Sequence, residues 1–199
     1  MTITNGYCTL AQLKGRLGIA TSDTSSDTEL ERVIESASRF IDRDRRRVFY
    51  ATTATRYWTP THSKHVWVDD IVTLTTLGVA TAAGLSYSTW TVDTDFLTEP
   101  FNANDGPIMK VVVHPNSGKY FVPGLLKSVR IAASFGYAAA VPDEIQQAAI
   151  LLAQYVWLRK DAPFGTAGFS LLGEIAANPN MMPADVRGLI NSVPRRVAQ

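Results

Sequence analysis

The chain has 199 residues, of which 46% are hydrophobic and 19% are charged, so it carries enough apolar material for a folded core and is not disordered as a whole. Its formal net charge of +1 excludes a strongly basic nucleic-acid coat and a strongly acidic tail. Its single cysteine, Cys8, excludes an intramolecular disulfide and fits synthesis in a reducing cytoplasm.

The sequence shows no targeting or membrane-spanning segment. Its first residues lack the charged and apolar regions of a signal peptide. The longest strongly apolar run, residues 148–156, is shorter than the roughly 20 residues that cross a bilayer. We therefore expect a soluble protein that is made inside a cell.

A short helix is predicted near the N-terminus. It begins at Thr9, which forms a capping-box pattern with Gln12 three residues later. Three leucines within residues 10–17 supply its apolar stripe, and Gly18 can end it in a left-handed conformation.

A second, longer helix has the strongest amphipathic pattern in the chain. Either Thr28 with Glu31 or Ser26 with Glu29 offers a capping box at its start. Acidic residues lie early and arginines late, which complements the helix dipole. Its predicted apolar face consists of Leu30, Val33, Ile34, Ala37, Phe40, Ile41 and Val48.

Between residues 51 and 137 the helical pattern is replaced by short β-branched and aromatic segments. Turn formers separate them, for example at 104–107, 115–118 and 123–124. The predicted strands are 55–59, 65–68, 71–74, 90–92, 108–113 and 128–133. Short strands at these intervals predict an antiparallel sheet or a small barrel.

A third helix opens at Pro142 and is apolar almost all round, so it must be central to the core or covered by a neighbouring subunit. Pro163 and Gly165 end it. A Gly- and Ala-rich segment follows, and Pro183 starts a last short helix. We expect the core helices to pack through Phe40, Ile41, Ile145, Ala149, Leu152, Tyr155 and Val156.

These elements predict an α+β fold, in which an antiparallel β-rich insertion separates the second and third helices of a small bundle of three to four helices. The predicted division is 1–50 for the N-terminal helices of the core, 51–137 for the β-rich insertion, 138–164 for the central core helix and 165–199 for a C-terminal segment with a short helix.

The search for catalytic chemistry finds no candidate site. His62 and His65 lie i and i+3 apart, which places them on opposite faces of a strand unless a turn intervenes, so surface residues are favoured over a metal site. Cys8 has no basic neighbour and fits apolar packing better than nucleophilic catalysis. No phosphate loop, dinucleotide fingerprint, nucleophile elbow or zinc-helix motif occurs. We expect no catalytic residue, no metal and no cofactor.

A basic cluster lies at the C-terminal end of the second helix and consists of Arg39, Arg43, Arg45, Arg46 and Arg47. The favoured interpretation is a solvated helix end, stabilised by the dipole and by Asp42 and Asp44. The alternative is a contact with DNA phosphates or with an acidic partner. Aromatic residues are not interleaved with the arginines, which disfavours a base-stacking platform.

Several segments together resemble a known family. They are a short Leu-x-x-Leu helix, a Ser/Asp loop, the amphipathic segment 29–42, the stretch Phe135-Gly136-Tyr137-Ala138 leading to 141–145, the apolar run 148–153, and Arg159-Lys160-Asp161-Ala162-Pro163-Phe164-Gly165. This order resembles the head–tail connector (head completion or adaptor) proteins of long-tailed bacteriophages. The likeness covers both ends of the chain, and the large β insertion departs from the smaller members.

The resemblance implies a non-enzymatic virion protein in the head–tail neck, made in the host bacterial cytoplasm and without membrane contact. It implies a ring, typically of twelve subunits, beneath a portal protein and above a downstream neck, stopper or tail-terminator protein. Genomic DNA would pass through its channel without sequence specificity, and the basic cluster could line that channel or join subunits. The residues expected to dock on the portal are Met181, Met182, Val186, Leu189, Ile190, Val193, Arg195 and Arg196. The alternative function is a nucleic-acid-binding module that uses residues 43–47.

Overall fold

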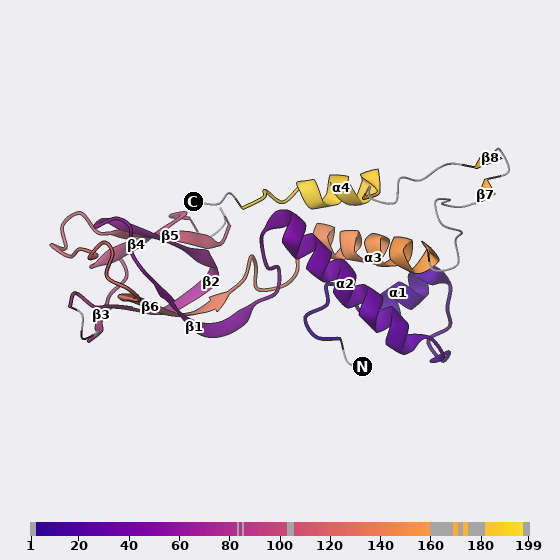
Figure 1. Cartoon of the computed structure of the whole chain (residues 1–199), viewed down its shortest axis with the longest axis horizontal. Coiled ribbons are helices and arrows are strands. Elements are labelled where there is room, and N and C mark those ends of the chain that lie inside the picture. Colours follow the sequence, from indigo (N-terminus) through magenta and orange to yellow (C-terminus); the bar gives the residue numbers. More distant parts are fainter. Residues whose placement is uncertain are drawn as a thin grey trace. The chain divides into compact units, whose positions relative to one another are not determined.

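The computed structural model describes residues 3–82, 84, 86–102, 106–159, 169–170, 173–174 and 182–196. It confirms the predicted α+β class, with helices and an antiparallel sheet (Figure 1). The chain forms two compact units: Met1–Arg46 with Val141–Val197, and Arg47–Ala140. The second unit is thus inserted into the sequence of the first.

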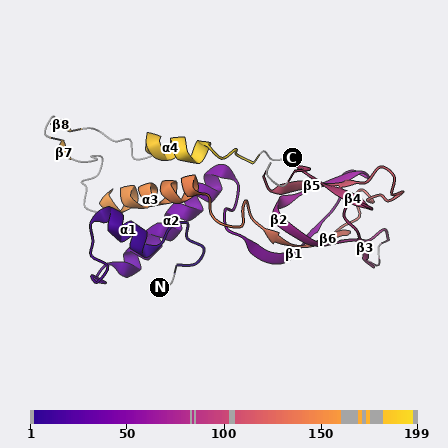
Figure 2. The same cartoon turned by 180° about the vertical axis from the view of Figure 1, so that it is seen from behind.

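The first unit is helical and is built from α1 (Leu10–Leu17), α2 (Asp27–Arg45), α3 (Asp143–Leu158) and α4 (Ala184–Asn191). Helix α3 contacts each of the other helices, and α1 also contacts α2 (Figures 1 and 2). The two short strands β7 (Phe169–Ser170) and β8 (Gly173–Glu174) pair with each other. Within the described residues, no helix is both long and apolar enough to cross a membrane.

Helix α1 has the predicted caps. The Thr9 N–H donates to Gln12 Oε1 at 2.8 Å, and the Gln12 N–H donates to Thr9 Oγ1 at 3.2 Å. At the other end Gly18 is left-handed, with a φ of 72°. The chain therefore enters and leaves α1 as its sequence predicts.

Helix α2 begins differently from the prediction. Its N-cap is Ser26, which has φ −112° and ψ 9° and makes no side-chain capping hydrogen bond. An N-cap side chain usually reaches the first turn from an extended backbone, which Ser26 does not have. Both predicted capping boxes, Ser26 with Glu29 and Thr28 with Glu31, are wrong. The helix ends at Arg45 with Arg46 as its left-handed C-cap, so Val48 lies beyond it and is 41% exposed.

Helices α3 and α4 each follow a proline. Pro142 and Pro183 are extended N-caps, and their carbonyls accept hydrogen bonds from Gln146 and Arg187 at 2.9 Å. Each helix therefore begins one residue after its proline. The predicted end of the third helix at Pro163 and Gly165 lies outside the described residues.

Most of the residues predicted to pack the helical core are buried in the structure. Ile41, Ile145 and Ala149 are fully buried, and Leu152 is 6% exposed. Tyr155 is half-buried. Phe40 and Val156 are 41% and 39% exposed, so their predicted burial is wrong. Both border an open groove, because no described helix covers that side of α2 and α3.

The second unit is an antiparallel sheet with the strand order β1-β6-β2-β5-β4, and β3 pairs with β2. Its strands are β1 (Thr52–Trp58), β2 (His65–Val79), β3 (Ser88–Trp90), β4 (Phe96–Glu99), β5 (Ile108–Val113) and β6 (Val129–Phe135). A core cluster fills its interior, where the rings of Trp90 and Phe121 stack with centroids 5.0 Å apart.

Besides shifts of one to three residues at the ends of β1, β3 and β6, the predicted strands differ from the observed ones in two ways. The segments 65–68 and 71–74 are parts of one strand, β2, which pairs with β5 over its first part and with β6 over its second. The register shifts between Trp67 and Ile71, where the exposed Asp69 and the buried Asp70 interrupt the apolar pattern. Strand β4 was not among the predicted strands.

Candidate functional site

The two neighbouring histidines lie together but lack the ligands for a metal. A bend at residues 61–64 intervenes, so the rings of His62 and His65 stack with centroids 4.6 Å apart rather than lying on opposite faces. Burial lowers the pKa of His65, and the charges of Lys110 and His62 lower it further. Among the described residues, no group of three or more His, Cys, Asp or Glu side chains could hold a metal ion.

Cys8 is buried, as its apolar interpretation requires. Burial raises the pKa of its thiol to about 11, because the thiolate is less well solvated than the neutral thiol. The thiol is therefore protonated near neutral pH, which is the opposite of what a catalytic nucleophile needs.

Arg47 does not belong to the predicted basic cluster, because its side chain is buried in the interior of the sheet unit. Its Nη1 lies 2.8 Å from Asp70 Oδ2, and both side chains are only 5% exposed. Its guanidinium also lies 5.3 Å from the centre of the Tyr137 ring. This residue stabilises the fold and presents no charge to a partner.

Two other arginines of the cluster, Arg39 and Arg45, form ion pairs with Asp42 and Asp44, the carboxylates that the sequence analysis names. Arg39 Nε lies 3.1 Å from Asp42 Oδ2, and Arg45 Nη2 lies 2.6 Å from Asp44 Oδ2. The remaining two, Arg43 and Arg46, are exposed, and neither makes a hydrogen bond or an ion pair through its side chain among the described residues. The five arginines thus do not form one basic surface.

The helical unit contains a groove of about 250 Å³ between the C-terminal halves of α2 and α3 and residues 182–183. Its apolar lining comes from Ala37, Phe40, Leu152, Tyr155, Val156, Met182 and Pro183. Ser36, Arg43 and Arg159 add the polar lining, and none of the lining residues that the structure describes is acidic. We call this surface the α2/α3 groove.

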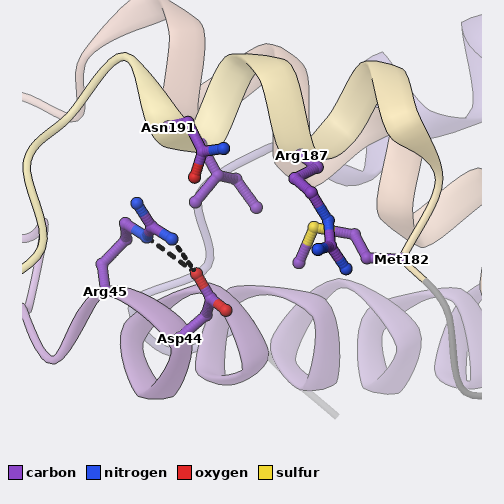
Figure 3. Close-up of a pocket in the computed structure, with 6 residues that line it drawn as sticks. Asp44, Arg45, Met182, Arg187 and Asn191 are labelled. Carbon is purple, nitrogen blue, oxygen red and sulfur yellow. Dashed lines mark hydrogen bonds and ion pairs between the residues drawn. The ribbon is translucent and has the colours of Figure 1, made fainter.

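A smaller pocket of about 120 Å³ lies between α2 and α4 (Figure 3). The bonded pair Asp44 and Arg45 comes from α2, and Arg187 and Asn191 come from α4. The Arg187 side chain lies beside Met182 (Figure 3). Because most of the described lining residues are polar or charged, this pocket is less suited to an apolar partner than the α2/α3 groove.

The residues predicted to dock on a portal are only partly accessible. Val186, Ile190 and Val193 are 1%, 1% and 5% exposed, because the apolar face of the α4 segment packs into its own helical unit. They are not available to a partner while α4 stays packed, which corrects their assignment as surface contacts. Met182, Leu189 and Arg196 are half-buried, Arg195 is exposed, and Met181 lies outside the described residues.

The groove itself was not foreseen. The sequence predicts that Phe40, Leu152, Tyr155 and Val156 pack in the core, because they continue the apolar face of each helix, and it predicts that Met182 contacts a portal. The one signal that could have indicated it is the composition of α3, which is apolar nearly all round and needs more cover than a small bundle supplies.

Comparison with known proteins gives no match to a family model and none to a curated protein. Two solved structures contain similar chains. One, "Neck of empty GTA particle computed with C6 symmetry", is 19% identical with a TM-score of 0.63 and covers 100% of this chain and 95% of that chain. The other, "Neck of native GTA particle computed with C12 symmetry", is 17% identical with a TM-score of 0.59 and covers 100% and 94%. This chain shares their fold.

Proposed function

We propose that this chain is a structural, non-enzymatic subunit of a phage-type neck, a head–tail connector or adaptor. The observation that carries the proposal is the end-to-end fold likeness to neck chains of GTA particles, which leaves almost no part of either chain unmatched. GTA denotes a phage-like gene transfer agent. The family resemblance in the sequence points independently to the same kind of particle.

The motif that contributes most to that resemblance has a physical basis in this fold. Gly136, in Phe135-Gly136-Tyr137, has a φ of 150°, and a Cβ there would lie 2.3 Å from the Tyr50 carbonyl oxygen. The position therefore requires glycine. It lies where the chain leaves β6 on its way to α3, so the motif marks the return from the inserted sheet to the helices.

Ring assembly is part of the proposal. The similar neck structures were computed with sixfold and twelvefold symmetry, and twelve copies of this chain would form a ring below the portal. A downstream neck, stopper or tail-terminator protein would bind the other side. Genomic DNA would pass through the channel without sequence-specific contacts, and the particle neck would be the site of function.

We propose that the accessible residues near the C-terminus contact the portal. Arg195 is exposed and Arg196 half-buried, and the Arg196 N–H is bonded to the Arg45 carbonyl at 3.0 Å, which holds this segment against the end of α2. An exposed cation such as Arg195 on a tethered segment suits an acidic partner surface. The change of Arg195 and Arg196 to Glu should weaken portal binding without altering the helical unit.

The test is assembly of the full chain, alone and with a portal protein, followed by mass photometry and electron microscopy. The expected result is a closed ring that binds the portal coaxially, and a portal-binding loss in Arg195→Glu/Arg196→Glu with rings intact. A chain that stays monomeric at all concentrations and does not bind the portal would refute the proposal.

The alternative, a nucleic-acid-binding module, has less support. It relied on five arginines acting together, but Arg47 is buried against Asp70, and two others are paired with carboxylates. Strong binding to bare DNA with a steep salt dependence, abolished by Arg43→Glu/Arg46→Glu, would favour it.

A further inference from the structure

The α2/α3 groove is an apolar surface that the described residues leave open. Phe40 and Val156 are 41% and 39% exposed and lie on two different helices of the same groove. Single exposed apolar residues are ordinary, but a cluster that lines a concave surface marks a binding site for another protein surface.

The charge of the groove restricts its occupant. Its described lining residues include Arg43 and Arg159 and no carboxylate. Both arginines are exposed, and Arg43 makes no side-chain hydrogen bond or ion pair among the described residues. The complementary surface must therefore present carboxylates beside apolar atoms, because like charges brought together here would oppose binding.

The same chain presents such a surface at the beginning of α3. Asp143 and Glu144 are exposed, and neither side chain makes a hydrogen bond or an ion pair among the described residues. Two other exposed carboxylates of the helical unit are engaged locally: Asp23 accepts from the Ser25 hydroxyl at 2.7 Å, and Asp185 accepts from the Val186 N–H at 2.8 Å. The half-buried Val141 and Pro142 precede the acidic pair and add apolar surface.

These two surfaces cannot meet within one molecule. Asp143 lies at the first turn of α3, and Val156 and Arg159 lie at its other end. A helix rises about 1.5 Å per residue, so roughly 20 Å of rigid helix separates them. When complementary surfaces lie at opposite ends of one helix, each copy can bind the next one head to tail. Such a chain of copies closes into a ring when the rotation from one subunit to the next adds up to a full turn.

We infer that the α2/α3 groove of one subunit binds the N-terminal turn of α3 from the next copy of this chain, with Arg43 and Arg159 facing Asp143 and Glu144. This inference rests on the proposed neck function and assigns its subunit interface. Phe40 and Val156 supply the apolar contact, and the arginines fix the register.

Charge reversal provides the test. The assembly of the full chain is measured by sedimentation or mass photometry. Arg43→Glu/Arg159→Glu reverses the groove, and Asp143→Lys/Glu144→Lys reverses the opposite surface. The matched control is Arg32→Glu/Arg187→Glu, which makes the same change in net charge at exposed residues of the helical unit outside the groove and outside the proposed portal contact. Circular dichroism and thermal melting check that each variant is folded.

Each reversal alone should raise the concentration for half-assembly by about tenfold or more, since it places like charges at the interface. The control should assemble as the wild type does. The variant with all four changes carries carboxylates in the groove and lysines at the start of α3, so the two surfaces again have opposite charges and it should form rings. In an equimolar mixture of the two double variants, each variant can bind only the other. The mixture should therefore form rings with an even number of subunits.

The outcomes separate the two proposals. Rings of Arg43→Glu/Arg159→Glu at wild-type concentration would overturn the groove as the interface while leaving the neck function standing. Loss of rings in both double variants without recovery in the quadruple variant or the mixture would overturn the α3 N-terminus as the occupant. A wild type that forms no ring, alone or with portal, would instead count against the neck function itself.

Discussion

The buried ion pair between Arg47 and Asp70 allows a quantitative prediction, because the neighbouring Asp69 forms an exposed pair that provides its control. Arg47 Nη1 and Asp70 Oδ2 are 2.8 Å apart with both side chains 5% exposed. Arg56 Nη1 and Asp69 Oδ2 are also 2.8 Å apart, but those side chains are 43% and 42% exposed. The two acids are adjacent on β2, so the pairs share their distance and strand and differ mainly in burial.

Asp70→Asn should destabilise the sheet unit far more than Asp69→Asn. The first change leaves a buried guanidinium without its counter-charge, and removal of one partner of a buried pair costs about 3–5 kcal/mol. The second change removes a pair that water already screens, which is worth about 0–1 kcal/mol. The expected difference in the free energy of unfolding is therefore about 3 kcal/mol.

Urea unfolding measures this difference, with the fluorescence of the four tryptophans as the signal. With a slope of about 1–3 kcal/mol per molar urea, the Asp70→Asn midpoint should fall by about 1 M or more, and the Asp69→Asn midpoint should hardly move. Arg47→Met/Asp70→Leu should recover much of the loss, because an apolar pair leaves no charge buried. Equal losses for the two single variants would refute the assignment of Arg47 to the interior.

Three further changes test local features. Gly136→Ala should cost about 1–3 kcal/mol in urea unfolding, because its positive φ and the nearby Tyr50 carbonyl both exclude a side chain. Thr9→Ala should cost about 1 kcal/mol by removing the capping box with Gln12, and Thr9→Ser should retain most of it. The Cys8 thiol, with its pKa raised to about 11, should react slowly with a thiol reagent at pH 8 and rapidly in urea. Since the unfolded thiol releases its proton first, near pH 9, folding stability should fall between about pH 9 and 11, and Cys8→Ala should remove that dependence.

The sequence predicted best where local interactions decide the structure. The capping box of Thr9 and Gln12, the left-handed Gly18 and the proline before α3 all act within a few residues, so their positions could be read directly. Strand β5 was predicted residue for residue because its β-branched run is bounded by turn formers on both sides.

The errors occur where distant residues decide the outcome. Arg47 follows a helix with other arginines, and nothing local shows that Asp70, 23 residues later, will hold it in the sheet interior. Likewise, β2 is one strand because β5 and β6 pair with different parts of it. The two aspartates at 69–70 interrupt its apolar pattern, so the sequence alone suggests two strands. Periodicity assigns a face to each residue but does not identify the element that covers it.

Helix α3 shows why that distinction matters for function. Its composition required cover on nearly every side, and α1, α2 and α4 provide it over the part that contains Ile145, Ala149 and Leu152. Its C-terminal end keeps Val156 and Leu158 at 39% and 58% exposure. A folded monomer gains nothing from apolar side chains left in water, whereas a ring subunit buries them when the next copy binds. The proposed ring would account for this exposed apolar surface of α3, and the charge-reversal variants test that assembly.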